Sequence, residues 1–517
     1  MDGTVRAVNG NARSAAASGS VPKKSRRKEA PRGPCLSWPG RTWTVGAAHP
    51  TSPPIVPEER FGEPSPDRLI HGDSLDVAHA LLEEGFGGTI DLVYLDPPFA
   101  SQAAYTQEVR LDGPADGRVR RTKAYEDSWP VRKSSGGAGA RAEEADTEDG
   151  VGAYLDMLAP RLEAMSALLA PTGSIWVHLD WRASYLVRVL LDEVLGRQRF
   201  LNEIVWRRAP NLGRQATSGQ FGRTLDTIVV YGGPNAKLHP PTRLEPVEQS
   251  SVRRDEEGRA FITAPRGDYS DASMVRLAKE GRVHKTASGR QYIKYFLVPN
   301  AAGEMCRDRR IDTLWTDIAP LRHTPIAERT GFPTQKPRAL LERIIECASP
   351  EGGTVVDLFA GSGTTGDAAH AVGRTFILGD RSTVSINAAR ARLLRAGAAF
   401  AVESCGTLPV PSEGELVVTI EHAASGDVKA LLEKPAEPVG WAVGRRITTA
   451  EGARGPFVAA WHAERRLGTV PVPAAHDAAF SLPRADKDSS SLEARVYTDD
   501  GAVLVHHPRM KQVELSL

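Results

Sequence analysis

The sequence is poor in cysteine and has no long hydrophobic run. Its four cysteines, at positions 35, 306, 347 and 405, form no CxxC pair, so they indicate neither a zinc site nor a disulfide framework. No stretch of 18 or more apolar residues is present, which excludes a typical membrane-spanning helix. The first residues also lack the apolar segment of a signal peptide. We therefore expect a soluble protein of a reducing cytoplasm, with no metal site and no membrane partner.

Net charge is nearly absent as well, at +1, but the charges are unevenly distributed along the chain. Residues 1–50 hold nine Lys and Arg against two Asp and Glu, and residues 207–330 hold 21 against 14. Basic charge gathered in particular segments is what binding to a phosphate backbone requires. A solvated tail would give the same pattern in residues 1–50.

A chain of 517 residues is too long for one ordinary core, and its composition and sequence pattern predict several units. Residues 1–57 are rich in Gly, Ala, Ser, Pro and basic residues, which predicts a disordered basic arm. The other predicted units are the first half of a sheet domain (58–206), an irregular insertion (207–330), the second half of that domain (331–405) and a small, mostly β C-terminal domain (406–517).

Strand and helix patterns alternate on both sides of the insertion, which predicts an α/β fold with a doubly wound, mostly parallel, Rossmann-like sheet. Strands are expected at 69–70, 90–95, 174–179, 201–206, 226–231, 354–358 and 375–378, and helices at 76–84, 154–169, 185–195 and 337–348. Asp500-Gly501 predicts a hairpin between 492–498 and 502–506. Residues 112–150 are polar and Gly-rich, which indicates either a mobile loop that closes over a substrate or an idle insertion.

The tetrapeptide Asp96-Pro97-Pro98-Phe99 directly follows the apolar run 90–95. Because proline cannot occupy a central strand, the strand must end there, at the edge where open α/β sheets bind ligands. An exocyclic amino nitrogen on a base is a poor nucleophile, and two hydrogen-bond acceptors would direct its lone pair at a methyl donor. The Asp96 carboxylate and the Pro97 carbonyl supply acceptors, the two prolines fix the turn, and Phe99 can stack on the base.

A glycine-rich loop follows the run 354–358, and it carries an acidic residue at each flank. Gly361, Gly363 and Gly366 satisfy G-x-G-x-x-G, the pattern of dinucleotide-binding folds. Asp380, after the next strand, can accept from ribose hydroxyls. Asp357 ahead of the glycines favours S-adenosylmethionine, because a carboxylate there suits an ammonium group and not a pyrophosphate. The polar loop residues Ser362, Thr364 and Thr365 suit a zwitterionic methionine, and a nicotinamide oxidoreductase is the competing interpretation.

In this order, the two motifs resemble the permuted (beta-class) DNA amino-methyltransferases, in particular the modification subunits of type III restriction systems. The segments that carry the resemblance are LIHGD (69–73), DPPF (96–99), AYEDSW (124–129), YLDMLAPR (154–161), GSIWVHLD (173–180), LWTDI (314–318), TQKP (334–337) and DLFAGSGTT (357–365). They cover most of residues 68–395. The family often has Pro-Phe-Cys where this chain has Leu358-Phe359-Ala360, and the C-terminal region matches nothing in it.

The resemblance implies a set of site residues. The catalytic residues would be Asp96, Pro97, Pro98 and Phe99. Those that bind S-adenosylmethionine would be Asp73, Thr334, Gln335, Lys336, Pro337, Asp357, Phe359, Ala360, Gly361, Ser362, Gly363, Thr364, Thr365 and Asp380. Residues 207–330 would occupy the place of the target-recognition region.

The resemblance also implies the activity. Members with Asp at the first motif position usually methylate adenine N6 and those with Ser cytosine N4, so Asp96 favours a site-specific adenine-N6 methyltransferase of double-stranded DNA. The base must be flipped out of the duplex to reach such a pocket. Alternatives are cytosine-N4 methylation, action on RNA, and a specificity subunit of a restriction or defence complex with a separate nuclease or helicase. Family members often form homodimers.

Overall fold

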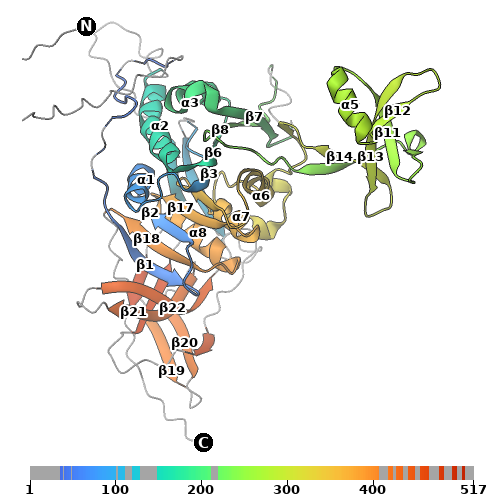
Figure 1. The fold of residues 1–517 in the computed structure, drawn as a ribbon. Coiled ribbons are helices and arrows are strands. Elements are labelled where there is room, and N and C mark those ends of the chain that lie inside the picture. The colour runs from blue at the N-terminus through green and yellow to red at the C-terminus, as the bar shows by residue number, and fades with distance from the viewer. Residues whose placement is uncertain are drawn as a thin grey trace, which may run out of the picture. The chain divides into compact units, whose positions relative to one another are not determined.

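The computed structural model describes most of the chain after residue 34. The described residues are 35–38, 40–47, 49, 51–99, 103–110, 119–127, 148–210, 219, 221–406, 417–422, 427–434, 440–448, 454–464, 477–481, 492–497 and 503–506. They form an α/β fold built on a mixed, mostly parallel central sheet with helices on both faces (Figure 1).

The central sheet contains 14 strands. In spatial order they are β15 (Leu314–Trp315), β7 (Phe200–Arg207), β8 (Leu225–Gly232), β6 (Leu169–Leu179), β3 (Ile90–Leu95), β16 (Thr354–Asp357), β17 (Thr375–Asp380), β2 (Arg68–His71), β18 (Phe400–Cys405), β1 (Ile55–Phe61), β22 (Arg454–Glu464), β21 (Gly440–Thr448), β24 (Leu492–Tyr497) and β25 (Val503–His506). From β6 to β18 all neighbours are parallel. The expected fold class is confirmed.

Helices cover both faces of this sheet. One hydrophobic cluster joins α1 (Ser74–Glu83), α2 (Glu148–Leu168) and α3 (Ser184–Leu191) to one face, and another joins α6 (Arg338–Ala348), α7 (Thr364–Ala371) and α8 (Thr383–Arg395) to the other. Strand β3 shows the division, because Val93 and Leu95 belong to the first cluster and Leu92 and Tyr94 to the second. A strand buried on both faces reads as a continuous apolar run, as residues 90–95 do.

Local chemistry sets the ends of these elements. Strand β3 ends immediately before Asp96 and the two prolines. Asp73 caps α1 by accepting from the Leu75 N–H, and Ser382 caps α8 by accepting from the Ser385 N–H. Side-chain caps of this kind satisfy N–H groups that have no partner within the helix. Helix α1 therefore begins just after the end of β2, and α8 just after the end of β17.

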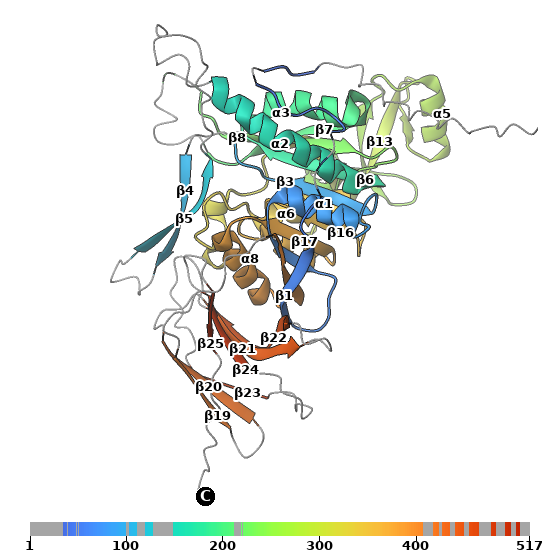
Figure 2. The ribbon, with the colours of Figure 1, turned by 90° about the vertical axis from the view of Figure 1, so that its left-hand side faces the viewer.

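The strands after residue 440 extend the same sheet through β1. Strand β1 pairs antiparallel with β18 and parallel with β22, and β21, β24 and β25 follow. A separate three-stranded sheet contains β19 (Val417–His422), β20 (Asp427–Lys434) and β23 (Asp477–Ser481) (Figure 2). The described residues after 406 are thus all in strands, and the expected hairpin is present as β24 and β25.

A second sheet lies within the predicted insertion. It contains β9 (Thr242–Pro246), β10 (Arg253–Arg254), β11 (Ala260–Pro265), β12 (Val283–Lys285), β13 (Gln291–Pro299) and β14 (Met305–Arg310), with α5 (Asp271–Lys279) packed on it. The insertion is narrower than expected, because β8 and β15, which lie inside 207–330, belong to the central sheet. The separate sheet spans residues 242–310.

Two expectations from composition are wrong in part. The arm predicted over 1–57 includes Trp43, which is 5% exposed and belongs to the hydrophobic cluster that contains α2. It also includes the first residues of β1. The polar composition of residues 1–57 did not indicate that Trp43 would be buried. Within the loop predicted over 112–150, residues 119–127 form strand β5 (Val119–Asp127), which pairs with β4 (Ala103–Arg110) (Figure 2). Residues 111–118 and 128–147 lie outside the described residues.

Candidate active site

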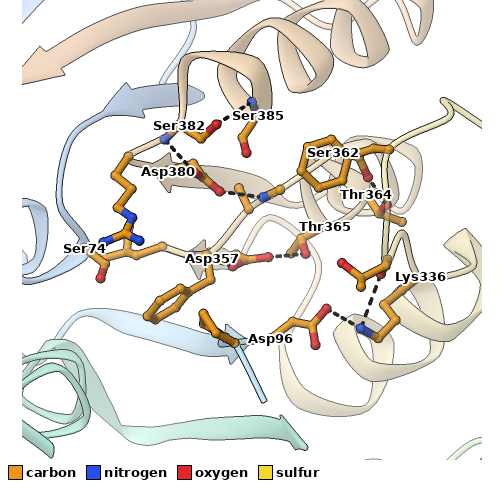
Figure 3. A pocket seen from close by; sticks show the side chains of 18 of the residues that line it. Ser74, Asp96, Lys336, Asp357, Ser362, Thr364, Thr365, Asp380, Ser382 and Ser385 are labelled. Atoms are coloured by element: carbon orange, nitrogen blue, oxygen red, sulfur yellow. Dashed lines mark hydrogen bonds and ion pairs between the residues drawn. The ribbon is translucent and has the colours of Figure 1, made fainter. Parts of the chain in front are cut away.

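Three carboxylates meet where neighbouring parallel strands end. Asp96 follows β3, Asp357 ends β16, and Asp380 ends β17. The strands are adjacent and parallel, so their carboxyl ends share one edge of the sheet. A cavity of about 280 Å³ lies at this edge and is lined by all three residues (Figure 3).

Most of the predicted site residues line this cavity. Those that do are Asp73, Asp96, Pro98, Thr334, Gln335, Lys336, Asp357, Phe359, Ala360, Gly361, Ser362, Thr364, Thr365 and Asp380. Those that do not are Pro97, Phe99, Gly363 and Pro337. Segments more than 200 residues apart in the chain thus converge on one space.

Asp96 has one bonded and one unbonded carboxylate oxygen. Its Oδ2 accepts a hydrogen bond from the Lys336 Nζ, and the two side chains are 17% and 10% exposed (Figure 3). Its Oδ1 is buried and has no hydrogen-bond partner. A buried acceptor without a partner is costly, so it marks a position that a ligand N–H would satisfy.

Phe99 lies beside Asp96 on a buried polar cluster. Its ring stacks on His178 with centroids 6.3 Å apart, and its N–H donates to Asp127 at 3.0 Å. His178 is fully buried between the Tyr94 hydroxyl, 3.0 Å from Nδ1, and the Asp226 carboxylate, 3.2 Å from Nε2. Burial, followed by the nearby carboxylates, raises the pKa of Tyr94 well above its usual value. This neutral phenol and the imidazole give Phe99 a rigid support.

Asp357 is a buried carboxylate with two donors. Thr365 Oγ1 donates to it at 2.5 Å and the Phe359 N–H at 3.0 Å. Burial raises the pKa of Asp357 to about 7; these hydrogen bonds oppose the rise, and the charges of Asp96 and Asp380 add to it. The cavity therefore has a negative potential that would be relieved by a cationic ligand.

Asp380, the last residue of β17, fixes the position of the glycine loop. Its two oxygens accept from the Gly361 N–H at 2.9 Å and the Ser382 N–H at 2.8 Å. Burial raises its pKa despite these bonds. The loop backbone is thus fixed to the start of α8, and Asp380 lines the cavity.

Two glycines of the loop are required by its geometry. Gly361 and Gly363 have φ of 50° and 73°, in the left-handed region that favours glycine. A Cβ on Gly363 would lie 2.8 Å from the Cα of Ala389 in α8. Gly363 is outside the cavity lining because its role is to let α7 and α8 approach closely.

The segment 334–337 borders the cavity and leads into helix α6. Among the described residues, Thr334 is the one non-glycine with positive φ, at 60°, a strained conformation that is concentrated at functional sites. Gln335 is buried and bonds only the chain itself, accepting from Thr330 and donating to the Glu328 carbonyl at 2.8 Å. Pro337 begins α6 as its N-cap. Thr334, Gln335 and Lys336 thus line the cavity, whereas Pro337 does not.

Asp73 is held by an arginine that the sequence reasoning missed. Arg161 Nη2 donates to both carboxylate oxygens, at 2.6 and 2.7 Å, and Arg161 Nε donates to Ser74 at 2.8 Å. Further lining residues not predicted are Ser74, Tyr94, Ala124, Met157, Phe332, Pro333, Leu341, Leu358, Arg381, Ser382 and Ser385. Two signals could have found some of them, namely the 154–161 motif for Arg161 and a capping serine after a strand for Ser382.

Two classes of feature are missing from the described residues. No cluster of three or more His, Cys, Asp or Glu side chains in the described ranges is arranged to bind a metal ion. No helix found in those ranges has the length and apolar character needed to span a membrane.

A family model described as "DNA methylase", for N6 and N4 amino-methyltransferases, matches residues 90–390. The chain belongs to this family. Its cofactor, as a family, is S-adenosylmethionine, and both motifs at the cavity fall inside the matched residues. The expected resemblance is confirmed, and the activity is that of a DNA methyltransferase acting on an amino group.

Two curated relatives are similar to this DNA methylase. The type II methyltransferase M.EcaI of Enterobacter cloacae is 25% identical over 344 residues, which are 61% of this chain and 67% of that protein. The StyLTI Mod subunit, from a type III restriction-modification enzyme of Salmonella typhimurium, is 25% identical over 374 residues. That match covers 63% of this chain and only 54%, about half, of the Mod subunit.

Solved structures of DNA methyltransferases are similar as well. The M1.HpyAVI–SAM complex is 15% identical with a TM-score of 0.34, covering 63% of this chain and 98% of that one. The PvuII DNA methyltransferase (cytosine-N4-specific) is 17% identical with a TM-score of 0.36, covering 65% and 88%.

Proposed function

We propose that this DNA methylase transfers a methyl group from S-adenosylmethionine to the exocyclic N6 of an adenine flipped out of duplex DNA. The observation that carries the proposal is Asp96. One of its oxygens already accepts from a nitrogen donor, Lys336, and the other is buried without a partner beside the cavity.

The target amino group would supply the hydrogen-bond donor that Asp96 Oδ1 lacks. An aryl amine has two N–H donors, and accepting from them draws the nitrogen lone pair out of the ring and stabilises positive charge that develops on it. We propose that an N–H of the base bonds Asp96 and that the Pro97 carbonyl takes the other. Phe99, supported by His178, would stack on the base.

The cofactor fits the charges of the cavity. Asp96, Asp357 and Asp380 share it, and the first and last raise the pKa of Asp357. A ligand with a sulfonium and an ammonium group relieves this repulsion, whereas a pyrophosphate would add to it, which argues against the nicotinamide alternative. We propose that Asp357 and Thr334 lie near the methionine part and that Asp380 accepts from the ribose. The bound sulfonium would supply the methyl group.

Adenine is proposed over cytosine on the resemblance alone, because Asp stands first in the tetrapeptide. The family model covers both amino groups, and cytosine N4 is the runner-up. The basic sheet at 242–310 lies within the proposed recognition region. Since one relative is a Mod subunit, a second proposal is that this chain is the modification subunit of a complex with a separate nuclease or helicase.

The test is methylation of a mixed-sequence duplex with labelled S-adenosylmethionine, followed by nucleoside identification and mapping. We expect N6-methyladenine at one motif. Asp96→Asn should lower kcat on the order of 10²–10³-fold, whereas its effect on cofactor affinity should be much smaller. The control is Asp91→Asn, the same change at the opposite end of β3, which should retain activity.

The choice of adenine as target and the role of Asp96 are tested by separate outcomes. N4-methylcytosine as product would refute the adenine assignment and preserve the role of Asp96. Full activity of Asp96→Asn would refute the proposed mechanism. Methylation that requires a co-purifying ATPase would support the modification-subunit proposal.

A further inference from the structure

Exposed aromatic and arginine side chains gather at the sheet edge beside Asp96. Strands β3 and β6 are parallel with Leu95 opposite Val177, so the turn that follows β6, with Trp181, lies beyond the same edge. Strands β7 and β8 are antiparallel with Arg207 opposite Leu225, so the end of β7 and the start of β8 also meet there. Three separate segments thus contribute to one surface.

We name this surface, made of Trp181, Arg182, Arg207 and Arg223, the Trp181 surface. Trp181 is 44% exposed, an unusual position for so large an apolar ring. The Arg223 guanidinium carbon lies 3.8 Å from the Trp181 ring centroid and that of Arg182 lies 5.0 Å from it. Arg207 and Arg223 are exposed, whereas Arg182 forms an ion pair with the buried Asp180.

Hydrogen bonds fix the backbone turn that carries this ring. Asp180 is 5% exposed, and its Oδ1 accepts from the Arg182 N–H at 2.8 Å, which fixes the turn around Trp181. The Asp180 carbonyl accepts from the Ser184 N–H at 3.1 Å, directly before α3. A rigid exposed indole loses little conformational freedom on binding a flat partner.

Duplex DNA is the partner that this surface fits. A base that leaves the stack to reach Asp96 stays on its strand, so the duplex must lie within one nucleotide's reach of this edge. Indole faces stack on any base, and arginines contact phosphates and stack on bases. The exposed arginines supply the positive charge that a phosphate backbone requires.

We propose that the Trp181 surface contacts the duplex next to the target nucleotide. Trp181 stacks on a base there, Arg207 and Arg223 contact phosphates, and together they stabilise the flipped-out state of the target. This inference rests on the proposed function and adds a contact to it. Trp181 is a binding residue in this proposal and takes no part in methyl transfer itself.

The test uses the full chain with a labelled duplex carrying the mapped methylation site, in which 2-aminopurine replaces the target base. Trp181→Ala should weaken binding on the order of tenfold and reduce the rise in 2-aminopurine emission, with an unchanged salt dependence. Trp181→Phe should retain most of both signals. Arg223→Ala should lower the log–log salt slope by about one.

Arg197→Ala is the matched control, because Arg197 is exposed just before β7 at the opposite edge of the sheet. It should change neither affinity nor slope. Calorimetric binding of S-adenosylmethionine should be unchanged in every variant, which shows that each is folded. Should Trp181→Ala lose this binding, Trp181→Phe and Arg223→Ala still decide the question.

Wild-type affinity, emission and slope in both Trp181→Ala and Arg223→Ala would overturn the inference. Loss of a co-purifying protein from these variants with DNA binding intact would overturn it too, and would make the surface a protein interface. Failure of the wild-type chain to methylate any duplex would instead refute the proposed function.

Discussion

Asp357 is the side chain whose protonation the cavity influences most directly. Burial raises its pKa to about 7, and the charges of Asp96 and Asp380 contribute to the rise. Below that pH the side chain is mostly neutral and attracts a cation weakly. Above it the carboxylate is ionised, so a positively charged ligand is held more strongly.

We therefore predict that the affinity for S-adenosylmethionine increases between pH 6 and pH 8. A group that titrates near pH 7 passes from about one tenth to nine tenths ionised over this range, so the gain from Asp357 should approach tenfold. Isothermal calorimetry at several pH values measures it. In Asp357→Asn that part of the pH dependence should vanish, and an identical slope in the variant would contradict the assignment.

At the scale of the elements, the glycine loop and two helices fit together with almost no space. Gly363 joins the loop to α7 and faces Ala389 of α8, and its φ is 73°. Gly373, just after α7, has nearly the same φ, 69°, but a Cβ there would meet no atom within 4 Å. The two positions thus differ in steric contact and share their backbone conformation.

Gly363→Ala should lower S-adenosylmethionine affinity by more than about tenfold, because the added methyl group must push α7 and its loop away from α8. Gly373→Ala should cost roughly 1–2 kcal/mol of stability from backbone strain and leave the affinity unchanged. Calorimetry and thermal denaturation of both variants separate the two effects. Equal affinities would mean that the loop tolerates the displacement.

Local sequence patterns predicted the elements that carry the chemistry. Strand β3 was expected at 90–95 and is found there, because a buried apolar run followed by Asp-Pro-Pro has few alternatives. The Lys336–Asp96 pair and the Arg161–Asp73 pair could not be derived in the same way. Each joins segments distant in the chain, and only the folded sheet determines that they meet.

The two failed expectations both concern segments of polar composition. Trp43 lies in a polar, Pro-rich segment with no periodic pattern, yet it packs on α2 and its Nε1 donates to Glu163 at 3.1 Å. Strand β5 lies in a charged segment, and it pairs with the strand directly before it, β4. Composition reports average behaviour, so it overlooks single anchoring contacts.

At the scale of the whole molecule, a buried ionic cluster connects β1, α8 and β24. Glu59 of β1 is 2% exposed. It pairs with Arg390 of α8 at 3.0 Å and with Arg495 of β24 at 2.6 Å, and it accepts from Tyr497 at 3.2 Å. Burial alone would raise the pKa of Glu59, but the two arginines outweigh it and the pKa is lowered.

Glu59→Gln should destabilise the protein by about 3–5 kcal/mol, because two buried guanidinium groups lose their counter-charge. Thermal and urea denaturation measure this loss. Glu245→Gln removes a partly exposed partner of Arg243 and Arg309 and should have little effect. If the two variants were equally stable, the ion pairs of Glu59 would contribute little to the stability of the protein.

The order of strands has a consequence for how the protein is made. In the middle of the sheet, β3 lies between β6 and β16, and β16 follows β3 by about 260 residues. At common rates of translation, one edge of β3 therefore waits on the order of 13–50 s for its neighbour to leave the ribosome. During that interval Asp96 already follows its strand, but the residues of 332–385 that line much of the cavity do not yet exist. This edge of β3 thus stays unpaired until β16 emerges, and the cavity can form only after residues 354–380 have been synthesised.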